Sequence, residues 1–216
     1  MAHDPANFSR RMLLRGAAFA AAAGPVNVIS TFNISYAAEP RVVKTLAAPE
    51  FDLLQAVVER LIPSDATGPG AKEAGVAHYI DRALGDALST SRAAYTSGLA
   101  ALDRYANSSR GKPFLQLTPV DQESVLIDCE TGGATGFVGS SAQFFGMLLN
   151  HTRQGMFGDP NYGGNANFVG WDLLGYPGVR TAVTSADQKA LENNQLKFVR
   201  SSAYDYGFKN ENHHGD

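Results

Sequence analysis

The sequence predicts an all-α protein: a compact helical domain of about five to six helices, with a long, ordered Gly/Pro-rich loop region in its C-terminal part. Three observations support this prediction. Apolar residues recur at spacings of three and four in several stretches, as they do on one face of a helix. No stretch shows the alternation of apolar and polar residues that is typical of a strand. Twelve of the 22 glycines lie between Gly132 and Gly178, where helices would tolerate few of them.

The first 37 residues predict a twin-arginine export signal and not a part of the fold. Arg10 and Arg11 precede an alanine-rich run at residues 17–23, which is too short to span a bilayer as a helix. A small-residue cleavage site follows, with Ala37 as the last residue removed. Signals of this kind export proteins that are already folded. The alternative is a basic amphipathic helix that stays in the cytoplasm.

Residues 38–216 are expected to form a single helical domain with a polar tail from about residue 208. The first helix is predicted over residues 49–61, where five apolar residues make one stripe. Pro49 suits the first turn of this helix, because its missing N–H group would be unpaired there. The helix must end before Pro63.

Four further helices are predicted along the chain. Apolar spacing indicates two of them, over residues 76–87 and 90–107. Thr118 is a natural N-cap for the next helix, with Pro119 in its first turn. The fifth long helix is predicted over residues 141–156.

Capping residues predict one helix end and one helix start in the C-terminal half. Gly155 or Gly158 is expected to end the fifth helix in the left-handed conformation. Beyond Gly178, a short helix is expected with Thr184 or Ser185 as its cap.

Composition argues against several classes of function. The formal net charge is −3, and removal of the signal would make it more negative, so no nucleic-acid partner is expected. A single cysteine allows neither an internal disulfide nor a cysteine-based metal site. No later stretch could cross a membrane, so any membrane association is expected to come through a complex. Charged residues make up 18%, below the roughly 25% of a typical soluble domain, which indicates that a partner covers part of the surface.

The candidate catalytic and metal-binding residues form no recognisable pattern. His78, Asp81 and His151 lack the spacing of a metal or acid–base motif, and Cys129 lies among apolar residues, which favours a buried side chain. Residues 68–76 lack the glycine spacing of a phosphate-binding loop. No catalytic residue, metal or cofactor is therefore expected in this chain. A stand-alone exported enzyme that uses Cys129, His78 or His151 remains the alternative.

The stretch GDPNYGGNANFVGWDLLGYPG, residues 158–178, carries the strongest functional signal. Its prolines, glycines and asparagines favour successive tight turns. One interpretation is an ordered loop that packs on its own helices, with Trp171 as the anchor. The other is a rigid loop that presents aromatic side chains to a partner.

We interpret part of this loop as a partner interface, shaped by glycines and contacted through aromatic residues. The expected interface residues are Asp159, Pro160, Tyr162, Gly163, Gly164, Asn165, Trp171, Tyr176 and Pro177. The alternative is a stand-alone exported sugar-binding module that uses Tyr162, Trp171 and Tyr176.

Two motifs carry a resemblance to a known family. RLIPSDATGPGAKEAGVAHYID, residues 60–81, and GMFGDPNYGGNANFVGWDLLGYPG, residues 155–178, resemble the gluconate 2-dehydrogenase subunit 3 family. The resemblance extends over roughly residues 49–178. The tail beyond Gly178 does not match the family signature.

The resemblance implies a non-catalytic small subunit of a periplasmic, membrane-associated dehydrogenase for gluconate or a related sugar or polyol. In such complexes a large flavoprotein holds FAD and oxidises the substrate. A multihaem cytochrome c subunit, which holds haem c, passes the electrons towards membrane quinone. The small subunit supports maturation of the flavoprotein and supplies the twin-arginine signal for joint export. The expected location is the periplasm, at the outer face of the inner membrane.

Overall fold

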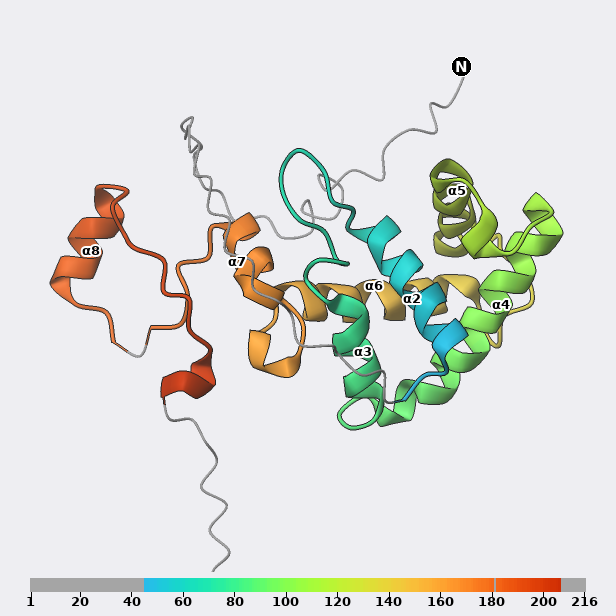
Figure 1. Ribbon diagram of the computed structural model, residues 1–216, viewed down its shortest axis with the longest axis horizontal. Helices are drawn as coiled ribbons and strands as arrows, with labels where there is room; N and C mark the ends of the chain where they lie inside the picture. Colours follow the sequence, from blue (N-terminus) through green and yellow to red (C-terminus); the bar gives the residue numbers. More distant parts are fainter. Residues whose placement is uncertain (1–44, 181, 207–216) are drawn as a thin grey trace, which may run out of the picture. The chain divides into compact units, whose positions relative to one another are not determined.

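The computed structural model describes residues 45–180 and 182–206, and this part of the chain is compact and helical, as the sequence predicts (Figure 1). The long helices are α2 (Ala48–Leu61), α3 (Val76–Leu84), α4 (Arg92–Arg110), α5 (Pro119–Glu130) and α6 (Ser141–Phe157). The short α-helices are α7 (Val169–Leu174) and α8 (Ser185–Glu192). The 3₁₀ helices are η1 (Ser89–Ser91), η2 (Phe114–Gln116), η3 (Pro160–Tyr162), η4 (Ala166–Phe168) and η5 (Ala203–Tyr206). The predicted export signal, with Arg10 and Arg11, and the tail from residue 208 lie outside the described residues.

Capping residues explain where the helices begin and end. The Thr118 hydroxyl accepts a hydrogen bond from the Asp121 N–H at 3.2 Å, so α5 begins at Pro119, as predicted. Gly111 is left-handed, with φ 76°, and closes α4 three residues beyond the predicted end. Helix α3 ends at Leu84, three residues before its predicted end, and is followed by turns.

The prediction that a left-handed glycine ends α6 is wrong. Gly155 lies inside the helix, and Gly158 is extended, with φ −70°. At both positions, the absence of a side chain instead lets neighbouring atoms lie close to the backbone. A Cβ on Gly155 would lie 2.7 Å from the Tyr79 ring of α3, and a Cβ on Gly158 would lie 2.5 Å from the Gln154 carbonyl oxygen.

Helix α6 is the centre of the packing, since it contacts α2, α3, α4, α5 and α7. Figure 1 shows it passing beside α2 and α3 towards α7. Helices α4 and α6 approach closely at Gly98, where an added Cβ would overlap the ring of Phe144. The largest fully buried side chains include Leu54, Leu61, Ile80, Tyr95, Leu99, Leu102, Phe114 and Leu148. In the part of the chain that the structure describes, no helix is long and apolar enough to cross a membrane.

The beginning of the described chain is held on α3 by a buried carboxylate. Asp81 Oδ1 accepts hydrogen bonds from the N–H groups of Thr45, at 3.0 Å, and Leu46, at 2.8 Å. Arg92 donates to the Thr45 carbonyl oxygen at 3.2 Å. Since α2 begins at Ala48, these bonds fix the position from which the first long helix starts.

We expect Asp81→Ala to lower the free energy of unfolding by about 2–3 kcal/mol, because two backbone N–H groups lose their acceptor. Chemical denaturation followed by circular dichroism measures this change. Asp86→Ala, at an exposed turn, is the matched control and should change the free energy by less than about 0.5 kcal/mol. Equal denaturation midpoints for the two variants would contradict the role of Asp81.

Candidate functional site

Asn165 organises the loop between α6 and α7. It is fully buried and left-handed, with φ 43°, a conformation that asparagine tolerates better than most residues. Its Nδ2 donates to the Gly158 carbonyl oxygen at 2.9 Å, and its Oδ1 accepts from the Gly170 N–H at 2.8 Å. Its backbone N–H donates to the Gly155 carbonyl oxygen at 2.7 Å. One residue therefore joins the end of α6 to the start of α7.

Two glycines let the loop lie directly on α6. A Cβ on Gly164 would overlap the carbonyl group of Gly155, and a Cβ on Gly170 would overlap the carbonyl group of Met156. Both obstacles are backbone atoms, which cannot rotate away as a flexible side chain could. The glycines at these two positions are therefore required for packing within the chain.

The loop also joins the two motifs that are distant in sequence. The Ala166 N–H donates to the Ala74 carbonyl oxygen at 3.0 Å. Arg82 donates to the Asn161 carbonyl oxygen at 3.2 Å, and Tyr79 donates to the side chain of Gln154 at 3.1 Å. The two motifs, together with the adjoining Arg82 and Gln154, are therefore bonded to each other around α3 and the end of α6.

Asp159 binds a segment far along the chain. Its carboxylate accepts hydrogen bonds from the Ser202 hydroxyl at 2.6 Å, the Ala203 N–H at 2.8 Å and the Asn161 N–H at 2.9 Å. Asp159 was predicted to shape or contact a partner interface. In the structure, the Asp159 carboxylate forms hydrogen bonds within the chain and holds residues 202–203 against η3.

Trp171 anchors the loop, as one of the two interpretations of the sequence proposes. Its side chain is 6% exposed, and its indole N–H donates to the Phe157 carbonyl oxygen at 2.9 Å. The rings of Phe168 and Tyr176 lie 5.4 and 4.9 Å from it, centroid to centroid. Trp171 is therefore part of the interior packing, and its polar N–H is satisfied there.

Tyr162 and Tyr176 are the predicted aromatic residues that reach the surface, with exposures of 51% and 41%. The Tyr162 ring meets the Tyr204 ring edge-on, with the two hydroxyl oxygens 3.1 Å apart, and this hydrogen bond raises the pKa of Tyr162. Leu174 is also exposed, although it was not among the predicted interface residues. Gly163 is left-handed, with φ 99°, at the end of η3.

Pro160 and Pro177 support the backbone around these exposed side chains. Pro160 begins η3, and its carbonyl oxygen accepts from the Gly163 N–H at 2.9 Å. The Pro177 carbonyl oxygen accepts from the Val199 N–H at 2.8 Å. The predicted interface residues are thus brought together in space, mostly as a frame for Tyr162 and Tyr176.

The candidate catalytic residues are engaged in separate contacts. The ring of His78 lies 4.7 Å from that of Phe51, and His151 Nδ1 is 3.0 Å from the Tyr95 hydroxyl. Cys129 is buried, which raises the pKa of its thiol to about 12, with the neighbouring Asp128 charge as a smaller cause. Such a thiol is protonated at neutral pH and is a poor nucleophile. Among the described residues, no group of three His, Cys, Asp or Glu side chains is placed to hold a metal ion.

The hollows along α4 lie apart from the loop. One, of about 350 Å³, lies between the start of α2, α4 and η2 and includes Glu50 and Asp103. Glu50 accepts from the Ala47 N–H at 2.9 Å, and Asp103 accepts from the Phe114 N–H at 2.8 Å. The two carboxylates of this hollow therefore accept hydrogen bonds from backbone N–H groups. None of the three aromatic residues of the sugar-binding alternative lines the hollow.

Comparison with known proteins identifies one family. A family model described as gluconate 2-dehydrogenase subunit 3 matches residues 48–178, more than half of the chain. The match begins at α2 and ends with the loop after α7. No curated protein and no solved structure matches the chain.

We expect Asn165→Ala to lower the free energy of unfolding by about 2–4 kcal/mol, because it leaves buried polar groups of Gly158 and Gly170 unpaired. Fluorescence should show a red shift, since Trp171, the only tryptophan, is packed in this loop. The control is Asn161→Ala, at an exposed position whose backbone makes the contacts described above. An Asn165→Ala protein as stable as this control would show that the loop does not depend on Asn165.

We expect His151 to make the fold less stable in mild acid. Burial lowers the pKa of His151 below its ordinary value of about 6.5. The unfolded chain therefore takes up this proton at a higher pH than the folded chain, so the free energy of unfolding falls as the pH drops below about 6.5. His151→Phe should reduce this slope in denaturation experiments between about pH 7 and pH 5. An unchanged slope would exclude His151 as its source.

Proposed function

Because the chain belongs to the gluconate 2-dehydrogenase subunit 3 family, we propose that it is the non-catalytic small subunit of a dehydrogenase complex for gluconate or a related sugar or polyol. The description of the family as a subunit implies partner subunits. In this proposal the chain supports maturation of a flavoprotein partner and is exported with it. The match over residues 48–178 is the observation that carries the proposal.

The surface of the loop supports a role in binding a partner. Tyr162, Leu174 and Tyr176 are exposed, and tyrosine is among the residues that most often anchor protein interfaces. The hydrogen bonds of Asn165 and Asp159 hold the backbone beneath these side chains in one conformation. Such preorganisation reduces the entropy lost on binding.

The geometry of residues 68–76, the segment compared above with a phosphate-binding loop, supports a cofactor site in a partner instead of this chain. The Gly70 N–H donates to the Ser64 hydroxyl at 2.9 Å and to Glu73 at 3.1 Å, and the Lys72 N–H donates to Glu59 at 3.2 Å. These donors would have to bind the phosphates of FAD, but they already bind carboxylates, which repel phosphate. The segment therefore does not fit a dinucleotide, which agrees with the proposal that the flavoprotein holds FAD. Haem c is assigned to a cytochrome partner by the family resemblance alone.

The proposed location is the periplasm, at the outer face of the inner membrane, with membrane association through the complex. Arg10 and Arg11 would direct export by the twin-arginine route. This route suits a flavoprotein, which has to fold around FAD before it crosses the membrane. A signal on the small subunit would then serve both chains.

The sugar-binding alternative has less support from the geometry. Of its three aromatic residues, Trp171 is buried and its N–H is bonded to the Phe157 carbonyl oxygen. Tyr162 is paired with Tyr204. Tyr176 is 41% exposed, but its ring packs edge-on against that of Trp171. The three aromatic residues are therefore not arranged to stack on both sides of a sugar.

We expect Arg10→Lys with Arg11→Lys to leave this chain and its flavoprotein together in the cytoplasm, because lysine keeps the charge but not the arginine pair. Immunoblots of cytoplasmic and periplasmic fractions, with flavin fluorescence of each, measure the distribution. Arg15→Lys makes the same change outside the pair and serves as the control. Arrival of the flavoprotein in the periplasm with the doubly substituted chain would refute the joint export.

A further inference from the structure

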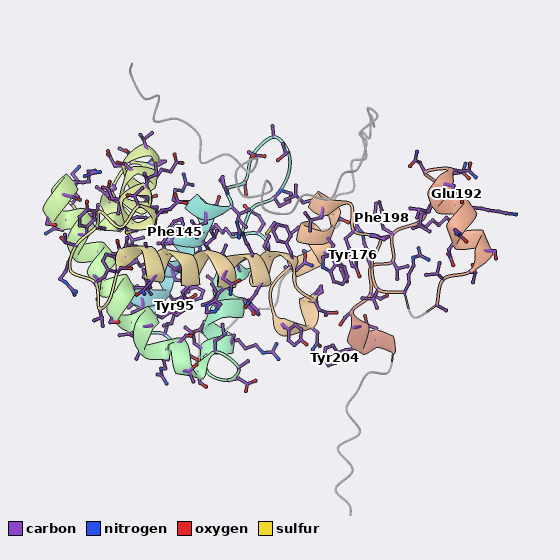
Figure 2. The ribbon with its side chains drawn as sticks, turned by 180° about the vertical axis from the view of Figure 1, so that it is seen from behind. Tyr95, Phe145, Tyr176, Glu192, Phe198 and Tyr204 are labelled. Atoms are coloured by element: carbon purple, nitrogen blue, oxygen red, sulfur yellow. The ribbon has the colours of Figure 1, made fainter. Side chains whose placement is uncertain are left out.

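Helix α4, the longest helix of the described chain with 19 residues, leaves a long part of its surface exposed. Figure 2 shows its green ribbon at the edge of the helical part. Its inner side packs on α6 through Tyr95, which is fully buried and stacks on the ring of His151. Arg92, Thr96 and Ala100 lie outside this buried side and are exposed.

Four positions of α4 share one strip of the helix surface. Positions 92, 96, 100 and 103 are spaced by four, four and three residues, and residues at such spacings are neighbours on one side of a helix. The strip carries a cation, Arg92, at one end and an anion, Asp103, at the other, with the smaller Thr96 and Ala100 between them. At a rise of 1.5 Å per residue, the two charged positions lie about 16 Å apart along the axis.

Both charged side chains keep unused hydrogen-bonding capacity. Arg92 donates from Nη2 to the Thr45 carbonyl oxygen, and Asp103 accepts at Oδ1 from the Phe114 N–H. Within the described residues, neither side chain has a further polar partner. The second carboxylate oxygen of Asp103 and the other N–H groups of the Arg92 guanidinium are therefore available to another molecule.

The surface along the strip is hollowed. A hollow of about 630 Å³ lies over residues 89–100, and it shares Thr96 and Ala100 with the hollow of about 350 Å³ that includes Asp103. Leu115, 48% exposed, lines the smaller hollow, and Val138, 87% exposed, lines a third hollow along α4. The short side chains of the strip and the hollows beside it allow a second helix to approach α4 closely.

We infer that this strip pairs with the same strip of a second copy of the chain, with the two α4 helices antiparallel about a twofold axis near residues 97–98. Arg92 of each protomer then faces Asp103 of its partner, and Thr96 faces Ala100. A twofold interface requires such a self-complementary surface, in which each contact occurs twice.

The charge pattern determines the choice of occupant. A second copy, placed antiparallel, offers a carboxylate to Arg92 and a guanidinium to Asp103 at the spacing that the strip itself has, whereas a parallel copy would bring like charges together. The inference goes beyond the proposed function and does not depend on it, because both halves of the contact belong to this chain.

The test reverses the two charges in separate full-length chains. Arg92→Glu places a carboxylate opposite Asp103, and Asp103→Lys places an ammonium group opposite Arg92, so each variant repels its own copies. The twofold axis makes every substitution act twice. An equal mixture of the two variants restores both ion pairs, because the new carboxylate of one chain faces the new ammonium group of the other.

Sedimentation velocity over a range of protein concentrations measures the dimer Kd. We expect Kd to rise about tenfold or more for each variant alone, and to return to within about threefold of the wild-type value in the mixture. Added salt should weaken the wild-type dimer, because it screens the ion pairs at the exposed edge of the contact.

Circular dichroism and thermal melting check the fold of each variant, since Asp103 also binds the Phe114 N–H. If Asp103→Lys does not fold, Ala100→Arg replaces it and blocks the close approach of the two helices. Gln188→Arg, at an exposed position of α8, is its control of equal charge. We expect Kd to rise about tenfold or more for Ala100→Arg and less than about threefold for the control.

A wild-type chain that stays monomeric at every concentration would overturn the inference and leave the proposed function intact. A mixture of the charge variants that dimerises no better than either variant alone, or equal Kd values for Ala100→Arg and its control, would do the same. If the wild-type chain is monomeric and these variants instead lose the flavoprotein, the strip belongs to the contact with the flavoprotein, against the inference.

Discussion

The structure depends on the buried side chain of Asn165. This residue bonds to the end of α6 and to the start of α7, and the next residue bonds to the turn before α3. Gly164 and Gly170 let the loop lie directly against carbonyl groups of α6. An amide is suited to this position because it can donate and accept at once. A change that disturbs this arrangement also affects the contacts of the loop with residues 202–204.

The loop performs two tasks with different residues. Asp159, Asn165 and Trp171 face inward and satisfy backbone or side-chain groups of the chain itself. Tyr162 and Tyr176 lie on this frame and remain exposed. A rigid frame beneath exposed aromatic side chains is consistent with binding to another protein. Because folding already orders this surface, less conformational entropy is lost on binding.

Much of the fold could be predicted from the sequence, because apolar spacing and caps such as Thr118 are local signals. The roles of the loop residues were harder to predict. Asp159 binds Ser202, 43 residues further along, and no local pattern indicates such a partner. A glycine after a helix often indicates a left-handed helix end. Gly158 is instead extended, with its backbone close to the Gln154 carbonyl oxygen, and this contact cannot be read from the sequence. The aromatic composition of the loop left two interpretations of Trp171 open, and only the packing and the bond of its N–H to the Phe157 carbonyl oxygen show that it is buried.

The central claim, that this chain is a subunit bound to a flavoprotein, is tested most directly by native purification from the envelope of its own host. A tag on this chain retrieves whatever is bound to it, and the visible absorption spectrum and mass spectrometry identify the contents. We predict flavin and haem bands, with a flavoprotein and a cytochrome c as the co-purifying chains. A colourless protein that elutes alone, from cells in which the dehydrogenase is active, would contradict the claim.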